Sequence, residues 1–340
     1  MNASGIDLPA APDTSSEKDT LRRIQASVKT RLDSVTEEMA ASVLRDAPLL
    51  ATMGQHLMAM RGKMFRPTLV LLCSDVENRS ERQAVTLAAA VELIHLATLV
   101  HDDAVDHSVL RRGMPTLNSL FTHQISVIMG DFLYSIALTK LVNLGDIAAL
   151  RALTRASTEM TIGEMRQLAV NDSLSFSEDD YYALIRSKTA SLMSAACEVG
   201  SIAGARAHRE SLIRYGDALG MAFQIADDLI DYTEASETTG KPTGLDLKEH
   251  KVTLPLIAAL RAMKPAERAR VDALFANENP SDAQVVEVIR IVTDNGGLEY
   301  ARQQGIVFAE QAREALSGLP DTVARTALLE SISYVMERHA

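Results

Sequence analysis

Apolar residues recur at helical spacing along almost the whole chain, and this pattern constrains the fold more than any other feature. Residues three, four and seven apart share one face of an α-helix, so this spacing marks a buried helix face. The first such face holds Leu21, Ile24, Val28, Leu32 and Val35. Further helices are predicted near residues 49–60, from 66, 80–106, 120–144, 147–169, 179–203, 209–233, 254–263, 266–276, 282–293, 299–316 and 323–337. No stretch alternates like a strand, which predicts a single all-α bundle of about ten or more helices.

The composition agrees with packed helices. Aromatic residues make up only 4% of the chain and Trp is missing, whereas Ala, Leu and Met, which are good helix formers, are plentiful. The formal net charge of −11 argues against a nucleic-acid partner, because phosphate backbones select basic surfaces. Cys73 and Cys197 lie in apolar stretches without metal-ligand spacing. We therefore expect two buried free thiols and a cytoplasmic location.

The two ends and the polar loops define the domain. Residues 1–18 lack the basic start and apolar run of a signal peptide and are predicted to form a disordered tail, with one helical domain over residues 19–340. No long window is free of charged or polar residues, so no transmembrane helix is expected. Two polar loops stand out, at residues 107–116 and 235–251. Ser281 with Gln284 has the spacing of a helix capping box.

Two aspartate-rich clusters occur near the carboxyl ends of long apolar helices. Both have the pattern Asp-Asp-x-x-Asp, and their members are Asp102, Asp103 and Asp106 in one cluster and Asp227, Asp228 and Asp231 in the other. Positions four apart lie one turn apart, so the outer carboxylates of each cluster share a helix face. Mg²⁺ suits such a site, because it binds a few carboxylates together with water and phosphate oxygens. A solvated acidic face would explain one copy, but two copies inside apolar helices indicate a metal-dependent site.

Basic side chains accompany these clusters. They are Lys63, Arg66, Arg111, Arg112, Lys188 and Lys241. Any one of them alone is more often a solvated surface charge. Together, in a chain that is acidic overall, they predict binding of more than one diphosphate group.

The ordered motifs resemble those of trans-type polyprenyl diphosphate synthases, from about residue 20 to the end. The matching segments are 62–67 (Gly-Lys-Met-Phe-Arg-Pro), 92–95 (Glu-Leu-Ile-His), 101–106, 111–116, 130–131, 163–167, 188–190 (Lys-Thr-Ala), 220–231 and 240–255. One departure is visible: the family has Gly-Gly-Lys-Arg before its Arg-Pro, and here Arg61 and Met64 replace one Gly and one Arg. The resemblance implies the isoprenoid synthase fold, in which helices surround a central cavity, and a prenyl transferase that joins isopentenyl diphosphate to an allylic prenyl diphosphate.

The resemblance also implies roles for the site residues. The expected main ligands of about three Mg²⁺ ions are Asp102, Asp106 and Asp227, supported directly or through water by Asp103, Asp228 and Asp231. The residues expected to contact the allylic diphosphate are Arg111, Lys188 and Lys241. Those expected to hold isopentenyl diphosphate are Lys63, Arg66, His95 and Arg112. Those expected near the reacting carbons are Thr189 and Gln224. His95 is included only because of its motif position, since a lone His on an apolar helix is usually a core residue.

Two small residues before the first cluster bear on product length. In the family, a bulky aromatic residue four or five positions before this cluster stops the growing tail. Those positions hold Thr98 and Ala97 here. We therefore expect an open tunnel and an all-trans product of about C40 to C50, suited to the side chain of ubiquinone or menaquinone. The alternative is that Ala97 only packs between helices and the product is shorter, such as farnesyl or geranylgeranyl diphosphate.

Three other functions match part of this pattern. A terpene cyclase of related fold needs only one aspartate-rich cluster and no isopentenyl diphosphate site. A metal phosphohydrolase using His101 and Asp102 would need further ligands, for which His56 and His123 are the candidates. A non-catalytic subunit is expected to have lost part of the acidic or basic set, and this chain keeps both. The resemblance further implies a homodimer, and a long lipid product implies transient membrane contact for release without an anchor.

Overall fold

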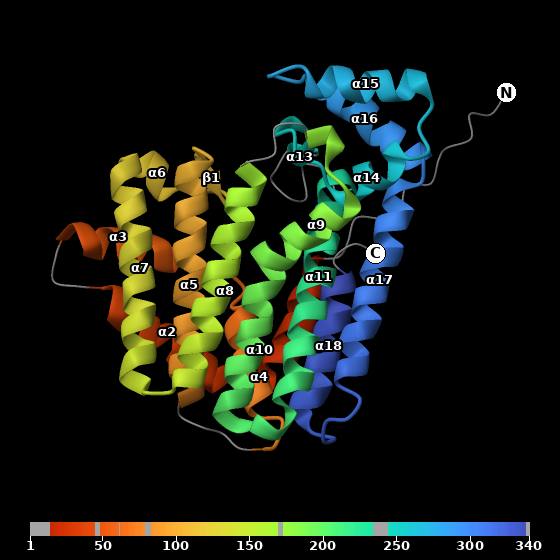
Figure 1. Cartoon of the computed structure of the whole chain (residues 1–340). Helices are drawn as coiled ribbons and strands as arrows, with labels where there is room; N and C mark the ends of the chain where they lie inside the picture. Colours follow the sequence, from red (N-terminus) through yellow and green to blue (C-terminus); the bar gives the residue numbers. More distant parts are fainter. Residues whose placement is uncertain are drawn as a thin grey trace.

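The part of the chain that the computed structural model describes is almost entirely helical (Figure 1). It comprises residues 14–44, 48–60, 62–78, 83–168, 173–233 and 244–337. In chain order the elements are α1 (Thr14–Gln25), η1 (Ala26–Val28), α2 (Lys29–Val43), α3 (Pro48–Ala59), α4 (Phe65–Ser74), α5 (Gln83–Val105), β1 (Leu110–Arg111), β2 (Met114–Pro115), α6 (Leu117–Leu120), α7 (His123–Leu144), α8 (Ile147–Leu168), η2 (Ser173–Ser175), α9 (Glu178–Ile185), η3 (Arg186–Ala190), α10 (Ser191–Gly204), η4 (Arg206–His208), α11 (Arg209–Thr233), α13 (Leu245–Lys248), α14 (Leu254–Leu260), α15 (Pro265–Phe275), α16 (Asp282–Asp294), α17 (Gly297–Ala315) and α18 (Val323–Glu337). The predicted all-α class is confirmed.

Several helix limits follow from their sequence signals. The helices predicted at 209–233 and 323–337 have these limits in the structure. Ser281 caps α16 by accepting a hydrogen bond from the backbone N–H of Gln284, and the predicted capping box is present. At the end of α7, Gly145 adopts φ 74°, a left-handed conformation that costs glycine little and stops the helix.

Two predicted helices are divided, and one small sheet was not predicted. The helix expected over residues 21–35 is interrupted by the 3₁₀ turn η1, and the helix expected over 179–203 is interrupted by η3, a π-helical segment. The loop at 107–116 contains the antiparallel pair β1–β2. Residues 1–13 of the predicted tail lie outside the described part, and α1 begins at Thr14.

The long helices lie side by side in a bundle. In Figure 1, α5, α7, α8, α10, α11, α17 and α18 run roughly along one direction, whereas α15 and α16 lie across one end. Helix α10 packs against α4, α8 and α11, and α11 packs also against α17. Gly200 makes the approach of α10 to α4 possible, since a Cβ there would lie 2.4 Å from the carbonyl oxygen of Val70. The bundle thereby holds the helices that carry the two aspartate clusters in fixed positions.

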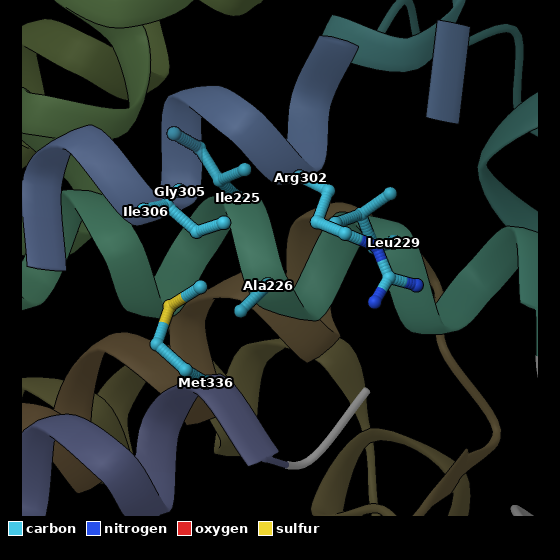
Figure 2. Close-up of a pocket in the computed structure, with 7 residues that line it drawn as sticks. All are labelled: Ile225, Ala226, Leu229, Arg302, Gly305, Ile306 and Met336. Carbon is cyan, nitrogen blue, oxygen red and sulfur yellow. The ribbon is translucent and has the colours of Figure 1, made fainter. Parts of the chain in front are cut away.

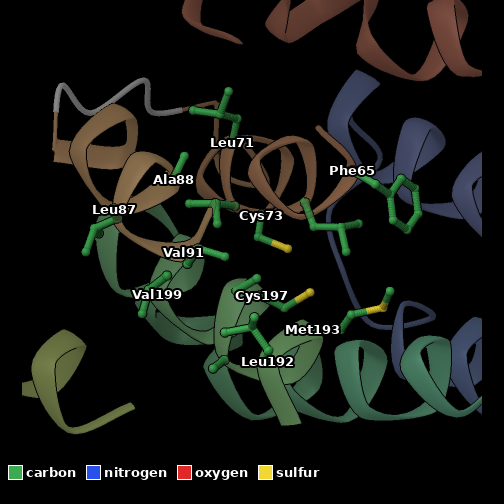
Figure 3. Packing of buried hydrophobic residues seen from close by; sticks show 14 of the residues in the cluster. Phe65, Leu71, Cys73, Leu87, Ala88, Val91, Leu192, Met193, Cys197 and Val199 are labelled. Carbon is green, nitrogen blue, oxygen red and sulfur yellow. The ribbon is translucent and has the colours of Figure 1, made fainter. Parts of the chain in front are cut away.

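The core of the bundle contains both cysteines. Cys73 of α4 and Cys197 of α10 lie together among apolar side chains such as Leu71, Val91 and Met193 (Figure 3). Both are free thiols and fully buried, as predicted. Burial, followed by the hydrogen bond with Cys197, raises the pKa of Cys73 well above its usual value. These thiols are therefore packing residues and poor nucleophiles.

Two described helices, α5 and α7, are long and apolar enough to cross a membrane by length and composition. In α5, 67% of the most apolar window is buried inside the protein, as expected for a core helix. In α7 the corresponding share is only 39%. Helix α7 therefore leaves part of an apolar face uncovered by the residues that the structure describes.

Candidate active site

One stripe along α5 is accessible in an otherwise buried half of the helix. Between residues 87 and 104, the partly exposed positions are His95, Thr98, Leu99, His101 and Asp102, and the rest are buried. Successive members of this set lie three or four residues apart, as in 95, 98 or 99, and 101 or 102, so they line one face. The first aspartate cluster lies at the end of this stripe.

A matching stripe runs along α11. Between residues 218 and 232, the accessible positions are Phe223, Gln224, Asp227, Ile230 and Asp231. Their spacing of three or four residues again defines a single face. The carboxyl-terminal end of this face carries the second aspartate cluster.

The two stripes border the same region. At the start of α4, Nη1 of Arg66 lies 3.2 Å from Nε2 of His95 on α5. Arg66 also interacts electrostatically with Asp227 on α11. Beyond the second cluster, Lys251 interacts in the same way with Asp106 of the first cluster. The structure therefore brings the two clusters, Arg66 and Lys251 into one region.

The three carboxylates of the first cluster have different surroundings. Asp103 is buried, and its Oδ1 accepts a hydrogen bond of 2.8 Å from Nε of Arg111. Asp106 is exposed. Burial and then the nearby carboxylate of Glu164 raise the pKa of Asp102 to about 6. The nearby cations Lys188 and Arg111 partly offset this shift.

In the second cluster, two carboxylates are engaged by the protein. Asp228 accepts hydrogen bonds from the hydroxyl of Tyr181 at 2.5 Å and from Nε2 of Gln224 at 2.8 Å. Asp231 accepts the first two backbone N–H groups of α13, each at 3.0 Å. Asp227 is the exposed member of the cluster. The structure thus leaves Asp227 accessible, whereas the other two carboxylates accept hydrogen bonds from the protein.

The donor set fits Mg²⁺. Asp102 and Asp106 lie one turn apart at the end of the α5 stripe, and Asp227 lies on the α11 stripe. In the described part of the chain, no three or more His, Cys, Asp or Glu side chains form a ready-made metal site. Mg²⁺ usually keeps several waters and takes substrate phosphate oxygens, so a few carboxylates are sufficient for it.

A π-helical segment carries the next pair of site residues. In η3, Nζ of Lys188 lies 2.6 Å from Oε1 of Glu164 and donates to Oε1 of Gln167 at 3.0 Å. The hydroxyl of Thr189 donates to Oε1 of Gln224 at 2.7 Å. π-helical turns often occur at functional sites. Here the segment places Lys188 beside the first cluster and Thr189 beside the α11 stripe.

The residues predicted for isopentenyl diphosphate gather around the start of α4. Arg66, His95 and Arg112 are mutually close, because the charges of both arginines contribute to lowering the pKa of His95, after burial. Nε of Arg66 is buried and has no partner in the structure. Nζ of Lys63 lies 5.6 Å from the ring centre of Tyr334. A cluster of accessible cations with one buried, unsatisfied donor is suited to an anionic ligand.

Arg112 is held in this cluster by the backbone. Its φ is 53°, and Nη1 donates to the carbonyl oxygen of Met60 at 2.9 Å. A Cβ at Gly62 would lie 2.5 Å from the same nitrogen. Glycine at this motif position therefore makes room for the guanidinium group.

Some predicted residues need separate mention. Lys241 lies outside the described residues. Ala97 is 2% exposed and packs in the core. Thr98 is partly exposed on the α5 stripe, and its hydroxyl donates to the carbonyl oxygen of His95 at 2.8 Å.

The histidines of the hydrolase alternative, His56 and His101, are hydrogen-bonded to the backbone carbonyl oxygens of Pro115 and Val127. Their positions give no support to a histidine-based metal site.

Sequence reasoning gave no role to several residues that contact the site. Glu164 and Lys251 lie in the matching segments, so motif position could have identified them. Glu92 also lies in such a segment and is 3% exposed beside Arg66. Tyr181 lies in no matching segment, and no sequence signal marks it.

A pocket of about 180 Å³ lies on the opposite face of α11 from the accessible stripe (Figure 2). It is lined mainly by apolar side chains of α11, α17 and α18: Ile225, Ala226, Leu229, Arg302, Gly305, Ile306 and Met336. It contains none of the predicted site residues and marks looser packing between these helices.

Comparisons with known proteins agree with this fold and site. The family described as polyprenyl synthetase matches residues 47–292. The all-trans-nonaprenyl-diphosphate synthase (geranyl-diphosphate specific) of Rhodobacter capsulatus is 37% identical over 292 residues, which are 85% of this chain and 89% of that protein. The octaprenyl diphosphate synthase of Escherichia coli is 36% identical over 295 residues, covering 86% and 91%.

A solved structure gives the same result for the fold. The polyprenyl synthase of Caulobacter crescentus, crystallised in complex with calcium and isoprenyl diphosphate, has a TM-score of 0.89 and 33% identity, covering 94% of this chain and 98% of its own. The expected isoprenoid synthase fold is confirmed. Fold and matches together define a prenyl-transferring enzyme. The chain belongs to the polyprenyl synthetase family, which removes the terpene cyclase and phosphohydrolase alternatives.

Proposed function

We propose that this enzyme condenses isopentenyl diphosphate with an allylic prenyl diphosphate in a Mg²⁺-dependent reaction and makes a long all-trans polyprenyl diphosphate. The observation that supports this most is the meeting of the α5 and α11 stripes, each with carboxylates at its end, through Arg66. Two diphosphates need cations at two places. The structure has cationic side chains beside His95 and beside Asp102.

The allylic diphosphate is assigned to the carboxylate side of the site. Asp102, Asp106 and Asp227 would hold Mg²⁺, which when bound would neutralise charge on the diphosphate leaving group. About three ions fit this role. The ammonium group of Lys188, which contacts Glu164 in the structure, would contact the diphosphate instead when this substrate binds. Lys241 is proposed from its motif position alone.

Isopentenyl diphosphate is assigned to the cationic cluster at the start of α4. Lys63, Arg66, His95 and Arg112 would bind its diphosphate, and the partnerless Nε of Arg66 is one available donor. The carbon–oxygen bond of the allylic diphosphate breaks and leaves an allylic cation. The double bond of isopentenyl diphosphate attacks this cation, and the proton is lost to the released pyrophosphate. Apolar side chains on the two stripes, such as Leu99 on α5 and Phe223 on α11, would shield the cation from water.

The long product is supported by two arguments. Thr98 lies on the accessible α5 stripe and is small, so it leaves space for a growing tail below the first cluster. The relatives described above are named for nonaprenyl and octaprenyl products. We therefore infer a product of about C40 to C50 for quinone side chains, in preference to a farnesyl or geranylgeranyl product.

The test is condensation by the purified protein. Labelled isopentenyl diphosphate is supplied with Mg²⁺ and, separately, with geranyl, farnesyl or geranylgeranyl diphosphate, and the dephosphorylated products are separated by chromatography. A ladder ending at about C40 to C50 supports the proposal. Products ending at C15 or C20 would keep the reaction and contradict the product length. No elongation with any primer would favour the non-catalytic subunit.

We further propose a homodimer formed through α7 and α8. These helices pack together and expose Ile128, Val142, Met165 and Leu168 at 64%, 63%, 67% and 70%. Exposed apolar patches of this kind mark interaction surfaces. In sedimentation experiments, Ile128→Glu with Val142→Glu should give a monomer, and Val323→Glu, a control on the equally exposed start of α18, should not. A dimer that survives the double substitution would contradict this interface.

A cytoplasmic enzyme with a lipid product must pass that product to a membrane. The two free buried thiols are consistent with a reducing compartment. We propose transient membrane contact during product release, and vesicle co-sedimentation before and after turnover measures it. Binding that is equal in both states would contradict a product-dependent contact.

A further inference from the structure

Tyr181 is a buried polar residue next to the site that none of the matched motifs contains. It lies on α9, is 2% exposed, and donates its hydroxyl proton to Oδ2 of Asp228 at 2.5 Å. Asp228 itself is 6% exposed. A buried tyrosine whose hydroxyl donates a hydrogen bond to a carboxylate is more than a packing residue, because phenylalanine would pack equally well.

The hydrogen bond continues through two further side chains. Oδ1 of Asp228 accepts from Nε2 of Gln224 at 2.8 Å, so the amide of Gln224 is turned with its oxygen away from the carboxylate. That oxygen accepts the hydroxyl proton of Thr189 at 2.7 Å. Asp228 thus fixes Gln224, and Gln224 fixes Thr189. Gln224 and Thr189 are the residues expected near the reacting carbons.

The carboxylate of Asp228, at the centre of this series of hydrogen bonds, is buried and has few alternative partners. Burial and then the charge of Asp246 raise the pKa of Asp228, and the hydrogen bonds from Tyr181 and Gln224 oppose that shift. Without the tyrosine hydroxyl, Oδ2 would be left buried without its donor, and the carboxylate would turn to replace it. Gln224 would then lose its fixed acceptor.

We propose that Tyr181 is a positioning residue for prenyl transfer: its hydroxyl holds Asp228, and through it Gln224, in the orientation that aligns Thr189 with the reacting carbons. This inference rests on the proposed function. It assigns Asp228 mainly to the hydrogen-bond chain and leaves Asp227 as the exposed carboxylate of that cluster. The residues of the isopentenyl diphosphate cluster take no part in the chain.

The chain offers a matched control for the test. Tyr182 is the next residue of α9, and its hydroxyl donates to Oε1 of Glu178 at 2.8 Å instead of to the site. Tyr181→Phe and Tyr182→Phe each remove one hydroxyl from the same helix. We expect Tyr181→Phe to lower kcat by about tenfold to a hundredfold, as a small misplacement of reacting groups does. The KM for isopentenyl diphosphate should stay within twofold, and Tyr182→Phe should leave kcat within twofold.

A double substitution tests whether the chain acts as a unit. Thr189→Val removes the far end of the chain. If the residues act together, Tyr181→Phe combined with Thr189→Val should be little worse than the more severe single variant. Independent, multiplying losses would contradict the proposed chain. If Tyr181→Phe proves unfolded by circular dichroism, Tyr181→Met replaces it, because it also removes the hydroxyl donor and its flexible side chain adapts to a core.

The outcomes separate this inference from the proposed function. An inactive wild-type protein would remove the proposed function itself. An active wild-type protein with a Tyr181→Phe variant of unchanged kcat would overturn only the role of Tyr181. A lower melting temperature with unchanged kcat would also overturn it, since that pattern defines a purely structural residue.

Discussion

Arg66 and His95 join α4 to α5, with Nη1 of the arginine 3.2 Å from Nε2 of the histidine. A guanidinium group only donates, so Nε2 must accept and the imidazole proton lies on Nδ1. Burial, followed by the charges of Arg66, Arg112 and Arg111, lowers the pKa of His95 well below its usual value. His95 is therefore neutral at physiological pH.

The first prediction concerns this neutral histidine. A lowered pKa means that His95 gains no proton between pH 6 and 8, so the KM for isopentenyl diphosphate should show no histidine titration in that range. His95→Gln keeps an acceptor for Arg66 and should raise this KM by less than about threefold, whereas His95→Phe removes it and should raise the KM about tenfold. A titration near pH 6.5 that His95→Gln abolishes would contradict the assignment.

The second prediction separates the carboxylates by role. Asp227→Ala removes an exposed ligand and should lower kcat by about a thousandfold or more with little change in stability. Asp231→Ala removes the acceptor of two backbone N–H groups of α13 and should lower the free energy of unfolding by about 1–2 kcal/mol. Steady-state kinetics and urea unfolding measure the two effects. Equal stability losses in both variants would argue against the division of roles.

The third prediction concerns product length. Thr98→Phe places a ring on the accessible α5 stripe and should shorten the product from about C40–C50 to about C15–C20. Ala97→Phe should also shorten it, but Ala97 is packed in the core, so this variant should lose about 1–3 kcal/mol of stability as well. Product chromatography and thermal melts test both. A full-length product from stable Thr98→Phe would show that other residues limit the chain.

The fourth prediction follows from a close helix contact behind the first cluster. A Cβ at Gly130 of α7 would lie 2.2 Å from Nε2 of His101 on α5. Gly130→Ala should therefore displace the ring and lower the free energy of unfolding by about 1–3 kcal/mol. His101→Ala in the same chain should restore part of the loss. Gly305→Ala is the control, because its Cβ would meet its nearest neighbour, Cε of Met336, at 3.4 Å.

The fifth prediction is a pH-dependent stability. Glu178 accepts hydrogen bonds from Tyr182 at 2.8 Å, Tyr300 at 2.8 Å and Arg261 at 2.6 Å. Burial acts to raise its pKa, but these hydrogen bonds together outweigh burial and the pKa is lowered from 4.5. A lowered pKa adds stability above the unfolded-state value and loses it as the pH falls through the folded-state value.

Glu178→Gln should accordingly be less stable than wild type by about 1–3 kcal/mol at pH 7.5. The difference should shrink as the pH is lowered below 4.5, where the wild-type carboxylate also takes up a proton. Urea unfolding at several pH values measures it. A difference that does not change with pH would show that the charge of Glu178 makes no contribution.

The sequence predicted helices better than breaks within them. Apolar spacing reports burial, and burial continues through η3, so the spacing over 179–203 indicated one helix. In this π-helical segment, Lys188 contacts α8 and Thr189 contacts α11. A local sequence pattern does not contain these contacts. The hairpin β1–β2 is too short for strand alternation to be visible.

The site was predictable where motifs carry it and unpredictable where distant segments meet. The aspartate pattern identified all six carboxylates, but not which ones the protein itself engages. Asp231 binds the backbone of α13, at a residue 14 positions away, and Asp228 binds Tyr181, which is 47 residues away. Both partners are set by tertiary packing. Likewise, sequence position could not separate buried Ala97 from accessible Thr98.

The π-helical segment sets the rotation of α9 relative to α10. The backbone N–H of Ser191 bonds to the carbonyl oxygen of Arg186, five residues earlier, where an α-helix would use the fourth. The wide turn thereby accommodates one extra residue. Deleting one residue from η3 would restore the α-helical bond and move Lys188 or Thr189 relative to their partners Gln167 and Gln224. The number of residues in this one turn therefore matters to the geometry of the site as much as the identity of the aspartates does.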